Sequence, residues 1–223
     1  MSGATLARVG GSHDRAAARP RLSNGMASVA AALWLASLAV GFGVLWRYKS
    51  TPGGQGRPPV QWPAQSAIFR NPNGATLLMF VHPRCPCTHA SISELARLLA
   101  RVPTRLQTHV VVAEPAGVPV GWTDTELVQR AHAIPGVDVV RDEAGREAAR
   151  FHAIVSGLAV LYDASGRRLF SGGITASRGH EGDSFGRERL LAALSGKPAD
   201  RDESPVFGCA LSSGPAAAAN RGT

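Results

Sequence analysis

Twenty consecutive residues of this 223-residue chain, from Ala27 to Trp46, carry no charged side chain. About 20 apolar residues are what a helix needs to cross the hydrocarbon core of a bilayer. Arg47, Tyr48 and Lys49 follow, and such side chains are typical of the membrane interface. A cleaved signal peptide is the alternative. The long leading segment, the length of the stretch and the lack of a small-residue cleavage site favour an uncleaved transmembrane anchor.

Basic residues are only slightly more frequent before the apolar stretch than after it. A surplus of Arg and Lys marks the cytoplasmic side of a span. The sequence therefore mildly favours a single-pass protein with its N-terminus inside and its C-terminal domain outside the cytoplasm, in a periplasm-like compartment. All three cysteines would then lie where disulfides persist. The residues compared are Arg8, Arg15, Arg19 and Arg21 on one side and Arg47, Lys49 and Arg57 on the other.

Composition divides the chain into five parts. Residues 1–26 are predicted to be a basic disordered arm, 27–46 the transmembrane anchor and 47–65 a Pro/Gly-rich linker. The range 66–209 has the apolar runs of a folded domain, and 210–223 is predicted to be a disordered tail. The net charge of +8 is concentrated early: the first 49 residues hold six basic side chains and one acidic one, and the rest hold 18 and 15. A nucleic-acid partner is therefore not expected.

The segment Cys85-Pro86-Cys87 lies between an apolar run, Thr76 to His82, and an amphipathic stretch, Thr88 to Arg101. This pattern predicts a strand, a tight turn that holds two thiols, and a helix. With Cys85 as the helix N-cap, Pro86 takes the first helical position, where its missing N–H costs nothing. The unpaired N–H groups and the dipole of a helix N-terminus stabilise a thiolate. A Cys85–Cys87 disulfide would close a very small, strained ring, which favours a redox or metal role over a permanent cross-link.

The rest of the domain alternates strands and helices and then ends with a hairpin and a helix. This order is typical of an α/β fold with a mixed sheet and helices on both faces. Asp124 is expected to cap one of the helices, and Asp163 to Gly166 are expected to form the turn of the hairpin. The expected elements are the strands 108–113, 137–140, 158–162 and 168–171 and the helices 124–133, 143–152 and 185–194.

The strand end Phe80-Val81-His82-Pro83-Arg84-Cys85 and the order of the elements after it resemble the thioredoxin superfamily, across residues 66 to 196. A narrower resemblance is to the membrane-anchored, thioredoxin-like proteins called RedB. It rests on three segments, His82 to Thr88, Gly172 to His180 and Ser204 to Cys209. The resemblance implies a thioredoxin-like fold in which Cys85 is the nucleophile.

Two features depart from ordinary thioredoxins. The motif is Cys-x-Cys, one residue shorter than Cys-x-x-Cys, so Cys87 does not occupy the usual resolving position. Thioredoxins also place a cis-proline before the hairpin, where it faces the cysteines and helps to bind the partner chain. This chain has Ile154-Val155-Ser156-Gly157-Leu158 there. The resemblance therefore does not carry the role of that proline over to this chain.

The predicted function is thiol–disulfide exchange with protein thiols or disulfides, carried out by Cys85, Cys87 and Cys209. The thiolate of Cys85 would attack a disulfide, and Cys87 or Cys209 would resolve the mixed disulfide. Three cysteines allow three different single disulfides, and the sequence does not choose among them. Cys209 lies near a chain end, where an unpaired or merely structural thiol is the simpler interpretation. The apolar Pro205-Val206-Phe207 beside it could nevertheless dock it on the domain.

Histidines flank the thiols and give an alternative function. His82 and His89 could lower a thiol pKa as imidazolium ions, or complete a site for Cu(I) or Zn(II) with Cys85 and Cys87. The alternative is thus a copper-binding protein that resembles thioredoxin-fold copper chaperones, whereas the redox function requires no cofactor. The structural interpretation of these histidines is simpler: His82 ends a strand, and His89 lies on the solvent-facing side of a helix. His180, in a glycine-rich loop, is a further candidate for the site, and an exposed loop residue is its structural interpretation.

Other chemistry has little support. The sequence has no Ser/His/Asp order, no phosphate-binding glycine loop and no His-Glu-x-x-His pattern, so hydrolase and nucleotide-binding functions are not expected. Asp142, Glu143 and Glu147 are expected to be caps and helix-surface charges. Trp122 is expected to pack beneath a loop.

Overall fold

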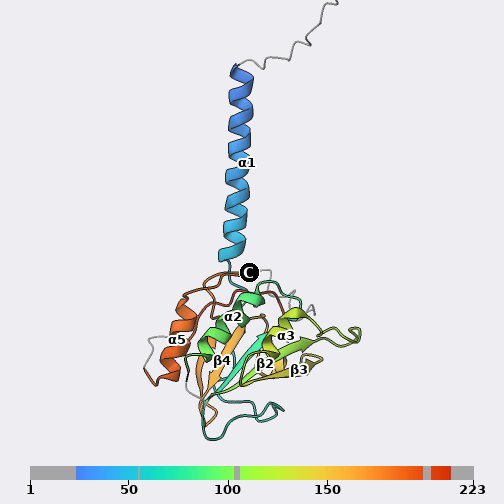
Figure 1. Cartoon of the computed structure of the whole chain (residues 1–223), viewed down its shortest axis with the longest axis vertical. Helices are drawn as coiled ribbons and strands as arrows, with labels where there is room; N and C mark the ends of the chain where they lie inside the picture. The colour runs from blue at the N-terminus through green and yellow to red at the C-terminus, as the bar shows by residue number, and fades with distance from the viewer. Residues whose placement is uncertain (1–23, 55, 103–105, 198–201, 212–223) are drawn as a thin grey trace, which may run out of the picture. The chain divides into compact units, whose positions relative to one another are not determined.

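The computed structural model describes residues 24–54, 56–102, 106–197 and 202–211, and the chain separates into two compact units, Met1–Val44 and Leu45–Thr223. Helix α1 spans Asn24–Ser50 (Figure 1). Within its segment Gly25–Ser50, an 18-residue window has a mean hydropathy of 2.0, and the segment is long and apolar enough to cross a membrane. Most of the predicted arm and the end of the predicted tail lie outside the described residues.

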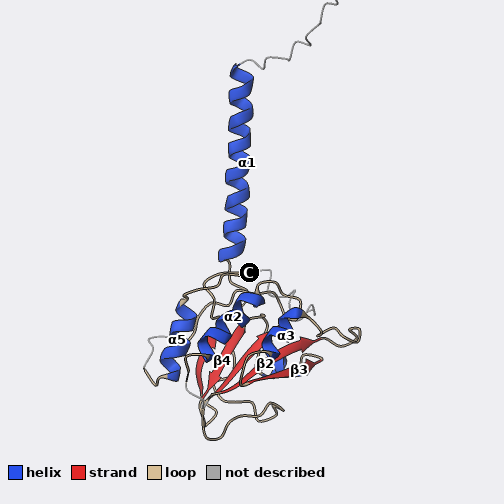
Figure 2. Cartoon of the chain, in the orientation of Figure 1, coloured by secondary structure: helices blue, strands red, loops and turns tan. Residues whose placement is uncertain are grey.

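The second unit is built on a five-stranded mixed sheet with the strand order β3-β2-β1-β4-β5 (Figure 2). Strands β1, β2 and β3 are parallel, and β4 and β5 form an antiparallel hairpin beside β1. The predicted mixed α/β fold is therefore confirmed. The strands are β1 (Thr76–Val81), β2 (Gln107–Glu114), β3 (Val137–Glu143), β4 (Leu158–Tyr162) and β5 (Arg168–Gly172).

Apolar layers cover both faces of this sheet. Side chains alternate across a strand, so Leu77 and Met79 of β1 pack in one layer while Leu78 and Phe80 pack in the other. A strand buried on both faces explains the unbroken apolar run that precedes the cysteines. The first layer includes α2 (Thr88–Leu99), α3 (Glu126–His132) and α5 (Phe185–Leu194), which lie on one face in Figure 2, and the second includes α4 (Arg146–Arg150).

Two predicted helices begin later than expected. Thr125, and not Asp124, caps α3, because the Thr125 hydroxyl accepts the backbone N–H of Val128 at 3.4 Å. Strand β3 continues to Glu143, and α4 begins only at Arg146. The hairpin strand β4 and the last helix α5 have the predicted bounds.

Two of the acidic residues near the start of α4, Asp142 and Glu147, are buried, so a surface position is wrong for them, whereas Glu143 is exposed as predicted. The capping role of Asp142 is confirmed, since its carboxylate accepts the N–H groups of Glu147 at 2.7 Å and Ala148 at 2.9 Å. Burial raises the pKa of Asp142, although these two hydrogen bonds oppose the shift. Glu147 in turn accepts the hydroxyl of Ser66 at 2.7 Å and the N–H of Ala67 at 3.1 Å. The two carboxylates thus fasten the start of the domain to α4.

The predicted Pro/Gly linker is not a free spacer, because much of it lies against the domain. The Trp62 ring packs edge-on against Phe151 at 5.0 Å and Tyr162 at 5.2 Å between ring centroids. Prolines lack an N–H but keep a good acceptor, and the Pro59 carbonyl accepts the Tyr162 hydroxyl at 3.0 Å. Three backbone hydrogen bonds of 2.8 Å continue this docking: Gly53 N–H to Val206 O, Arg168 N–H to Val60 O, and Trp62 N–H to Gly166 O.

Candidate functional site

The Cys-Pro-Cys segment forms consecutive turns between β1 and α2. The Cys85 N–H donates to the His82 carbonyl, and the Thr88 N–H donates to the Cys85 carbonyl, both at 3.1 Å. The N-cap of α2 is Cys87, whose side chain makes no capping hydrogen bond, so the predicted N-cap at Cys85 is wrong. Cys85 therefore lies two residues before the N-cap, outside the helix. Both thiols are buried, with 1% of Cys85 and 7% of Cys87 exposed.

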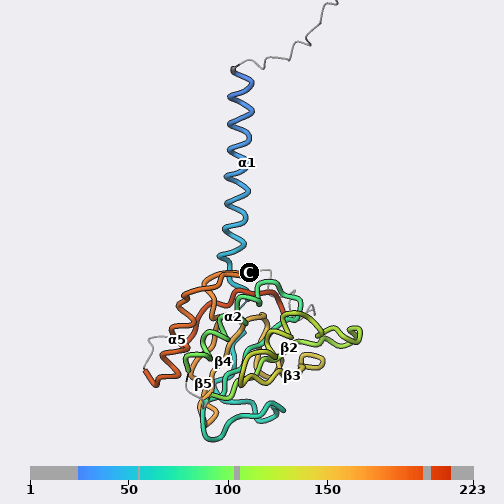
Figure 3. The backbone as a smooth tube through the Cα atoms, viewed as in Figure 1, coloured from blue at the N-terminus to red at the C-terminus, as the bar shows by residue number. Residues whose placement is uncertain are grey.

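The C-terminal segment brings the third cysteine to this turn. The Ser156 N–H donates to the Cys209 carbonyl at 2.8 Å, and the Leu211 N–H donates to the Ile154 carbonyl at 3.0 Å. Val155 and Ala210 form an antiparallel bridge between these two bonds. The segment therefore docks as a short strand on the residues that precede β4, and its path can be followed at the red end of the tube in Figure 3.

Side chains and close packing hold this segment in place. Val206 and Leu211 are buried in the apolar layer that contains Phe80. The guanidinium of Arg178 donates to the Gly208 carbonyl at 2.5 Å. Gly208 lies so close to the chain that a Cβ added there would be 1.8 Å from the carbonyl oxygen of Ser156. Glycine is thus needed at position 208 because of a close backbone approach.

The three cysteine sulfurs form one cluster. The Sγ atoms of Cys85 and Cys209 are 2.9 Å apart, and the sulfurs of Cys85, Cys87 and Cys209 all lie within 4.8 Å of one another. No histidine belongs to this cluster in the part of the chain that the structure describes. The arrangement can support thiol–disulfide exchange between Cys85 and Cys209, or binding of a soft metal ion by three thiolates.

The thiols differ in acidity. Burial raises the pKa of Cys85, but hydrogen bonds from the Cys209 and Thr88 side chains and from backbone N–H groups outweigh it, so the pKa lies below its ordinary value. Burial and the charge of Cys85 raise the pKa of Cys87, although Arg178 opposes the shift. Burial, followed by the interaction with Cys85, raises the pKa of Cys209 to about 12. Cys85 is therefore the most acidic of the three thiols.

A chain of hydroxyl groups supports that thiolate. The Ser156 hydroxyl accepts the His82 N–H at 2.8 Å and lies 2.6 Å from the Thr88 hydroxyl. When Thr88 donates to Cys85, Ser156 must be the donor to Thr88, so the three donors point in one direction. Hydrogen bonds in such a chain polarise and strengthen one another. Neither Ser156 nor Thr88 was predicted as a site residue, although Ser156 falls in the segment where thioredoxins have their proline.

Arg178 was also not predicted as a site residue. It interacts with the Cys87 thiol and with the Gly208 carbonyl, and so it connects two of the three cysteine-bearing segments. The guanidinium of Arg178 also lies over the Tyr48 ring, with its central carbon 5.1 Å from the ring centroid. The backbone N–H of Arg178 donates to the Lys49 carbonyl at 3.2 Å. Arg178 lies in the segment Gly172 to His180, on which the resemblance to RedB partly rests, and that position could have identified it as a site residue.

The predicted histidines lie beside the sulfur cluster or on the surface. The His82 ring nitrogen Nδ1 accepts the Arg84 N–H at 3.2 Å. Burial, and then the charge of Arg84, lower the pKa of His82, which disfavours an imidazolium ion there. His89 is partly exposed on α2, and His180 is exposed. Trp122 packs on this edge of the site, with the Arg84 guanidinium 4.1 Å from its ring centroid and the His82 ring edge-on at 6.0 Å.

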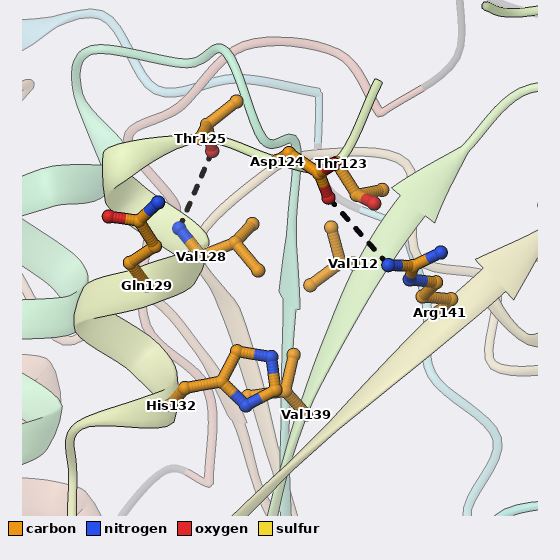
Figure 4. A pocket seen from close by; sticks show the side chains of 9 residues that line it. All are labelled: Val112, Thr123, Asp124, Thr125, Val128, Gln129, His132, Val139 and Arg141. Carbon is orange, nitrogen blue, oxygen red and sulfur yellow. Dashed lines mark hydrogen bonds and ion pairs between the residues drawn. The ribbon is translucent and has the colours of Figure 1, made fainter. Parts of the chain in front are cut away.

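A separate cavity of about 280 Å³ lies between α3 and the strands β2 and β3 (Figure 4). Valine side chains from these elements line its inner part, and an ion pair between Asp124 and Arg141, at 3.7 Å, lies at one side. None of its lining residues is a cysteine. The cavity is therefore not part of the thiol site.

Comparisons with known proteins concern the fold alone. No family model matches the chain, and no curated protein matches it. Similar solved structures include an uncharacterized conserved protein from Geobacillus kaustophilus (18% identity, TM-score 0.53, 74% of this chain and 94% of that one). A hypothetical protein from Sinorhizobium meliloti 1021 is similar over 74% of this chain and 96% of its own (21% identity, TM-score 0.54).

A secreted Mycobacterium tuberculosis disulfide oxidoreductase, described as homologous to E. coli DsbE, is similar over 56% of this chain and 82% of its own, with 17% identity and a TM-score of 0.40. The topology of the domain is the firmer observation. The central strand β1 leads into the cysteine turn and α2, and the parallel strand β2 follows. The antiparallel hairpin β4–β5 completes the sheet on the other side of β1, and α5 follows it. The domain therefore has a thioredoxin-like fold.

Proposed function

We propose that this protein is a membrane-anchored, RedB-like thiol–disulfide oxidoreductase or redox accessory protein that acts outside the cytoplasm through a Cys85–Cys209 pair. The observation that carries the proposal is the 2.9 Å separation of the two sulfurs. Thiol–disulfide exchange needs a thiolate directly beside a second sulfur, and the pair meets that condition.

The surroundings of the pair support this function. The thiolate of Cys85 has donors from Thr88 and from backbone N–H groups, which favour the charged form. Cys209 is held by two backbone hydrogen bonds of its segment to residues 154–156, so it meets Cys85 in a defined position.

Cys87 has a different role in this proposal. Its raised pKa keeps it protonated at neutral pH, and Arg178 lies beside it. Its sulfur belongs to the cluster, whose members lie within 4.8 Å of one another, but the 2.9 Å contact with Cys85 is made by Cys209. Cys87 is therefore the reserve sulfur, which can exchange with a Cys85 disulfide but does not form the principal pair. The sequence had left the choice between Cys87 and Cys209 open, and the geometry favours Cys209.

The test uses the full-length protein in mild detergent. Wild-type protein should catalyse either the reduction of insulin or the oxidative refolding of a reduced disulfide protein. The Cys85→Ser and Cys209→Ser variants should lose this activity, while Cys87→Ser should keep a measurable part of it. Wild-type protein that is inert in both assays would exclude the oxidoreductase function.

A second candidate function, copper binding, is supported by the three-sulfur cluster. Three thiolates at about 2.3 Å from one metal ion are separated from each other by about 4 Å, and the three sulfurs lie within 4.8 Å. Soft thiolate ligands favour Cu(I). The proposed ligands are then Cys85, Cys87 and Cys209, with Cys209 in place of the predicted histidine.

Copper binding can be separated from redox activity. The reduced full-length protein should take up one equivalent of Cu(I) in competition with a chromophoric Cu(I) chelator. Both Cys87→Ser and Cys209→Ser should weaken the binding, whereas His89→Ala should not. Absence of binding at micromolar Cu(I) would reject this candidate and leave the redox proposal unaffected.

A further inference from the structure

The two sulfurs of the principal pair differ in their access to solvent. Only 1% of Cys85 is exposed, and its sulfur contacts that of Cys209 in the docked C-terminal segment. Cys209 is partly exposed, and its neighbour Ala210 is exposed. A molecule that approaches the described part of the domain therefore reaches Cys209 before Cys85.

We propose that Cys209 is the sulfur that meets the redox partner, and that Cys85 is the inner sulfur, which exchanges only with Cys209. This inference rests on the proposed thiol–disulfide exchange. It differs from the sequence-based prediction, in which Cys85 of the turn reacts with the partner first. The partner is a dithiol, such as a pair of accessible cysteine thiols on another protein.

A direct reaction at Cys85 would require the C-terminal segment to leave. That movement would break the hydrogen bonds from Ser156 N–H to Cys209 O, from Leu211 N–H to Ile154 O and from Gly53 N–H to Val206 O. It would also expose two buried apolar side chains, those of Val206 and Leu211. Exposure of a buried apolar side chain to water is unfavourable. Reaction at Cys209 needs none of these changes.

The exchange then proceeds in two balanced steps. A partner thiolate attacks Sγ of Cys209 in the Cys85–Cys209 disulfide, so that a bond forms between the partner and Cys209 and the bond to Cys85 breaks. The electron pair of the broken bond stays on Cys85 as a thiolate. A second partner thiolate attacks the partner sulfur of the mixed disulfide and releases Cys209, which takes up a proton. The partner has then been oxidised to a disulfide and this protein reduced to a dithiol.

The acidity of the two thiols favours the same direction of attack. In thiol–disulfide exchange the thiol of lower pKa is the better leaving group. Cys85 has the lowered pKa and Cys209 the pKa of about 12, so attack at Cys209 expels the better leaving group. The Thr88 hydroxyl and the backbone donors stay beside Cys85 after the bond breaks. Attack at Cys85 would instead expel the poorer leaving group.

In this direction of exchange the protein accepts electrons from the partner thiols, and a disulfide of another protein or of a small molecule restores its own disulfide.

Glutathione as a monothiol probe tests the inference. The oxidised full-length Cys87→Ser protein, which has one thiol pair, is mixed with excess glutathione, quenched with acid within milliseconds to seconds, alkylated and mapped by mass spectrometry. Glutathione should be found on Cys209, and Cys85 should be found alkylated, with at least about tenfold more adduct on Cys209 than on Cys85. Cys87→Ala serves as a second background if Cys87→Ser fails to fold.

The possible results separate the inference from the function on which it rests. Adduct mainly on Cys85, or divided equally between the two sulfurs, would overturn the inference while the Cys85–Cys209 pair stands. Oxidised protein without a Cys85–Cys209 disulfide would overturn the proposed function as well. Adduct confined to Cys209 supports both.

Discussion

The sulfur atoms of Cys85 and Cys209 lie 2.9 Å apart although the residues are 124 positions apart in the chain. One sulfur comes from the turn after the central strand, and the other comes from a segment that follows the last helix. The entropic cost of closing a loop grows only slowly with its length, so a distant cysteine can serve the site as well as a near one. What matters is the docking of the C-terminal segment on residues 154–156, because that docking sets the position of the second sulfur.

The Thr88 hydroxyl is expected to contribute to the acidity of Cys85. Replacing Thr88 with Val keeps the shape of the side chain but removes the donor, so the pKa of Cys85 should rise. The pH dependence of thiolate absorbance in the reduced Cys87→Ser protein measures this change. Thr88→Ser is the matched control, since it keeps the hydroxyl and should leave the titration close to that of Thr88. Identical titrations of the Val and Ser variants would show that Thr88 does not act as a donor.

A methyl group at position 208 is expected to disturb the pairing of the two sulfurs. In Gly208→Ala the new Cβ would lie 1.8 Å from the Ser156 carbonyl oxygen, and a backbone atom cannot move aside cheaply. Overpacking of this kind costs about 1–3 kcal/mol, so the equilibrium constant for forming the Cys85–Cys209 disulfide should fall by about five- to 150-fold.

Glutathione redox buffers followed by acid trapping measure that constant. Ala210→Ser is the control, because Ala210 is exposed next to the same cysteine. It should behave as the wild type. A wild-type equilibrium constant in Gly208→Ala would mean that the close approach at position 208 does not govern the position of Cys209.

Local patterns in the sequence were sufficient to predict most of the domain. The apolar run of β1 and the amphipathic stretch after it place the Cys-Pro-Cys turn correctly, and the Asp163-to-Gly166 turn marks the hairpin. These elements depend on the periodicity and turn chemistry of short windows. The errors fall at helix starts, where Thr125 and Asp124 are both good caps and only the fold decides between them.

The sulfur pairing could not be derived in this way. It depends on a backbone hydrogen bond between Ser156 and Cys209. Nearly every residue has the same backbone groups, so the sequence does not show which of them will pair. The docking of the Pro/Gly segment was missed for the same reason, since the carbonyl of Pro59 and the ring of Trp62 find their partners only in the folded domain. The burial of Asp142 and Glu147 likewise follows from segments that are distant in sequence.

The stability of the reduced protein is expected to depend on pH on both sides of the ordinary thiol pKa of 9.0. The pKa of Cys85 is lower in the folded protein, so just below pH 9 the unfolded chain binds more protons and stability rises with pH. Above pH 9 the thiols of Cys87 and Cys209 remain protonated only in the folded protein, and stability should fall as the pH rises towards about 12.

Urea unfolding in the presence of a phosphine reductant, from about pH 7.5 to about pH 10.5, measures this profile. The Cys85→Ser protein is the control and should lack the rise below pH 9. The fall above pH 9 also contains a contribution from Tyr162, whose pKa burial raises, so the rise is the diagnostic part. A wild-type profile that falls throughout this range would contradict a lowered pKa of Cys85.

The carboxylate of Glu94 is expected to stabilise the fold without taking part in the exchange. Its side chain is fully buried on α2, where it binds the guanidinium of Arg187 at 2.6 Å and accepts the Gly182 N–H at 2.7 Å. Removing one member of a buried ion pair leaves the other charge poorly compensated. Arg187 would keep the exposed carboxylate of Asp183 as its remaining ion-pair partner among the described residues. Glu94→Gln should therefore lower the free energy of unfolding by about 3 kcal/mol. The exposed pair of Glu126 and Arg130 provides the control, and Glu126→Gln should change that free energy by less than about 1 kcal/mol. Both variants should still form the Cys85–Cys209 disulfide while folded, so a loss of the disulfide in folded Glu94→Gln would show that this ion pair also positions the sulfur cluster.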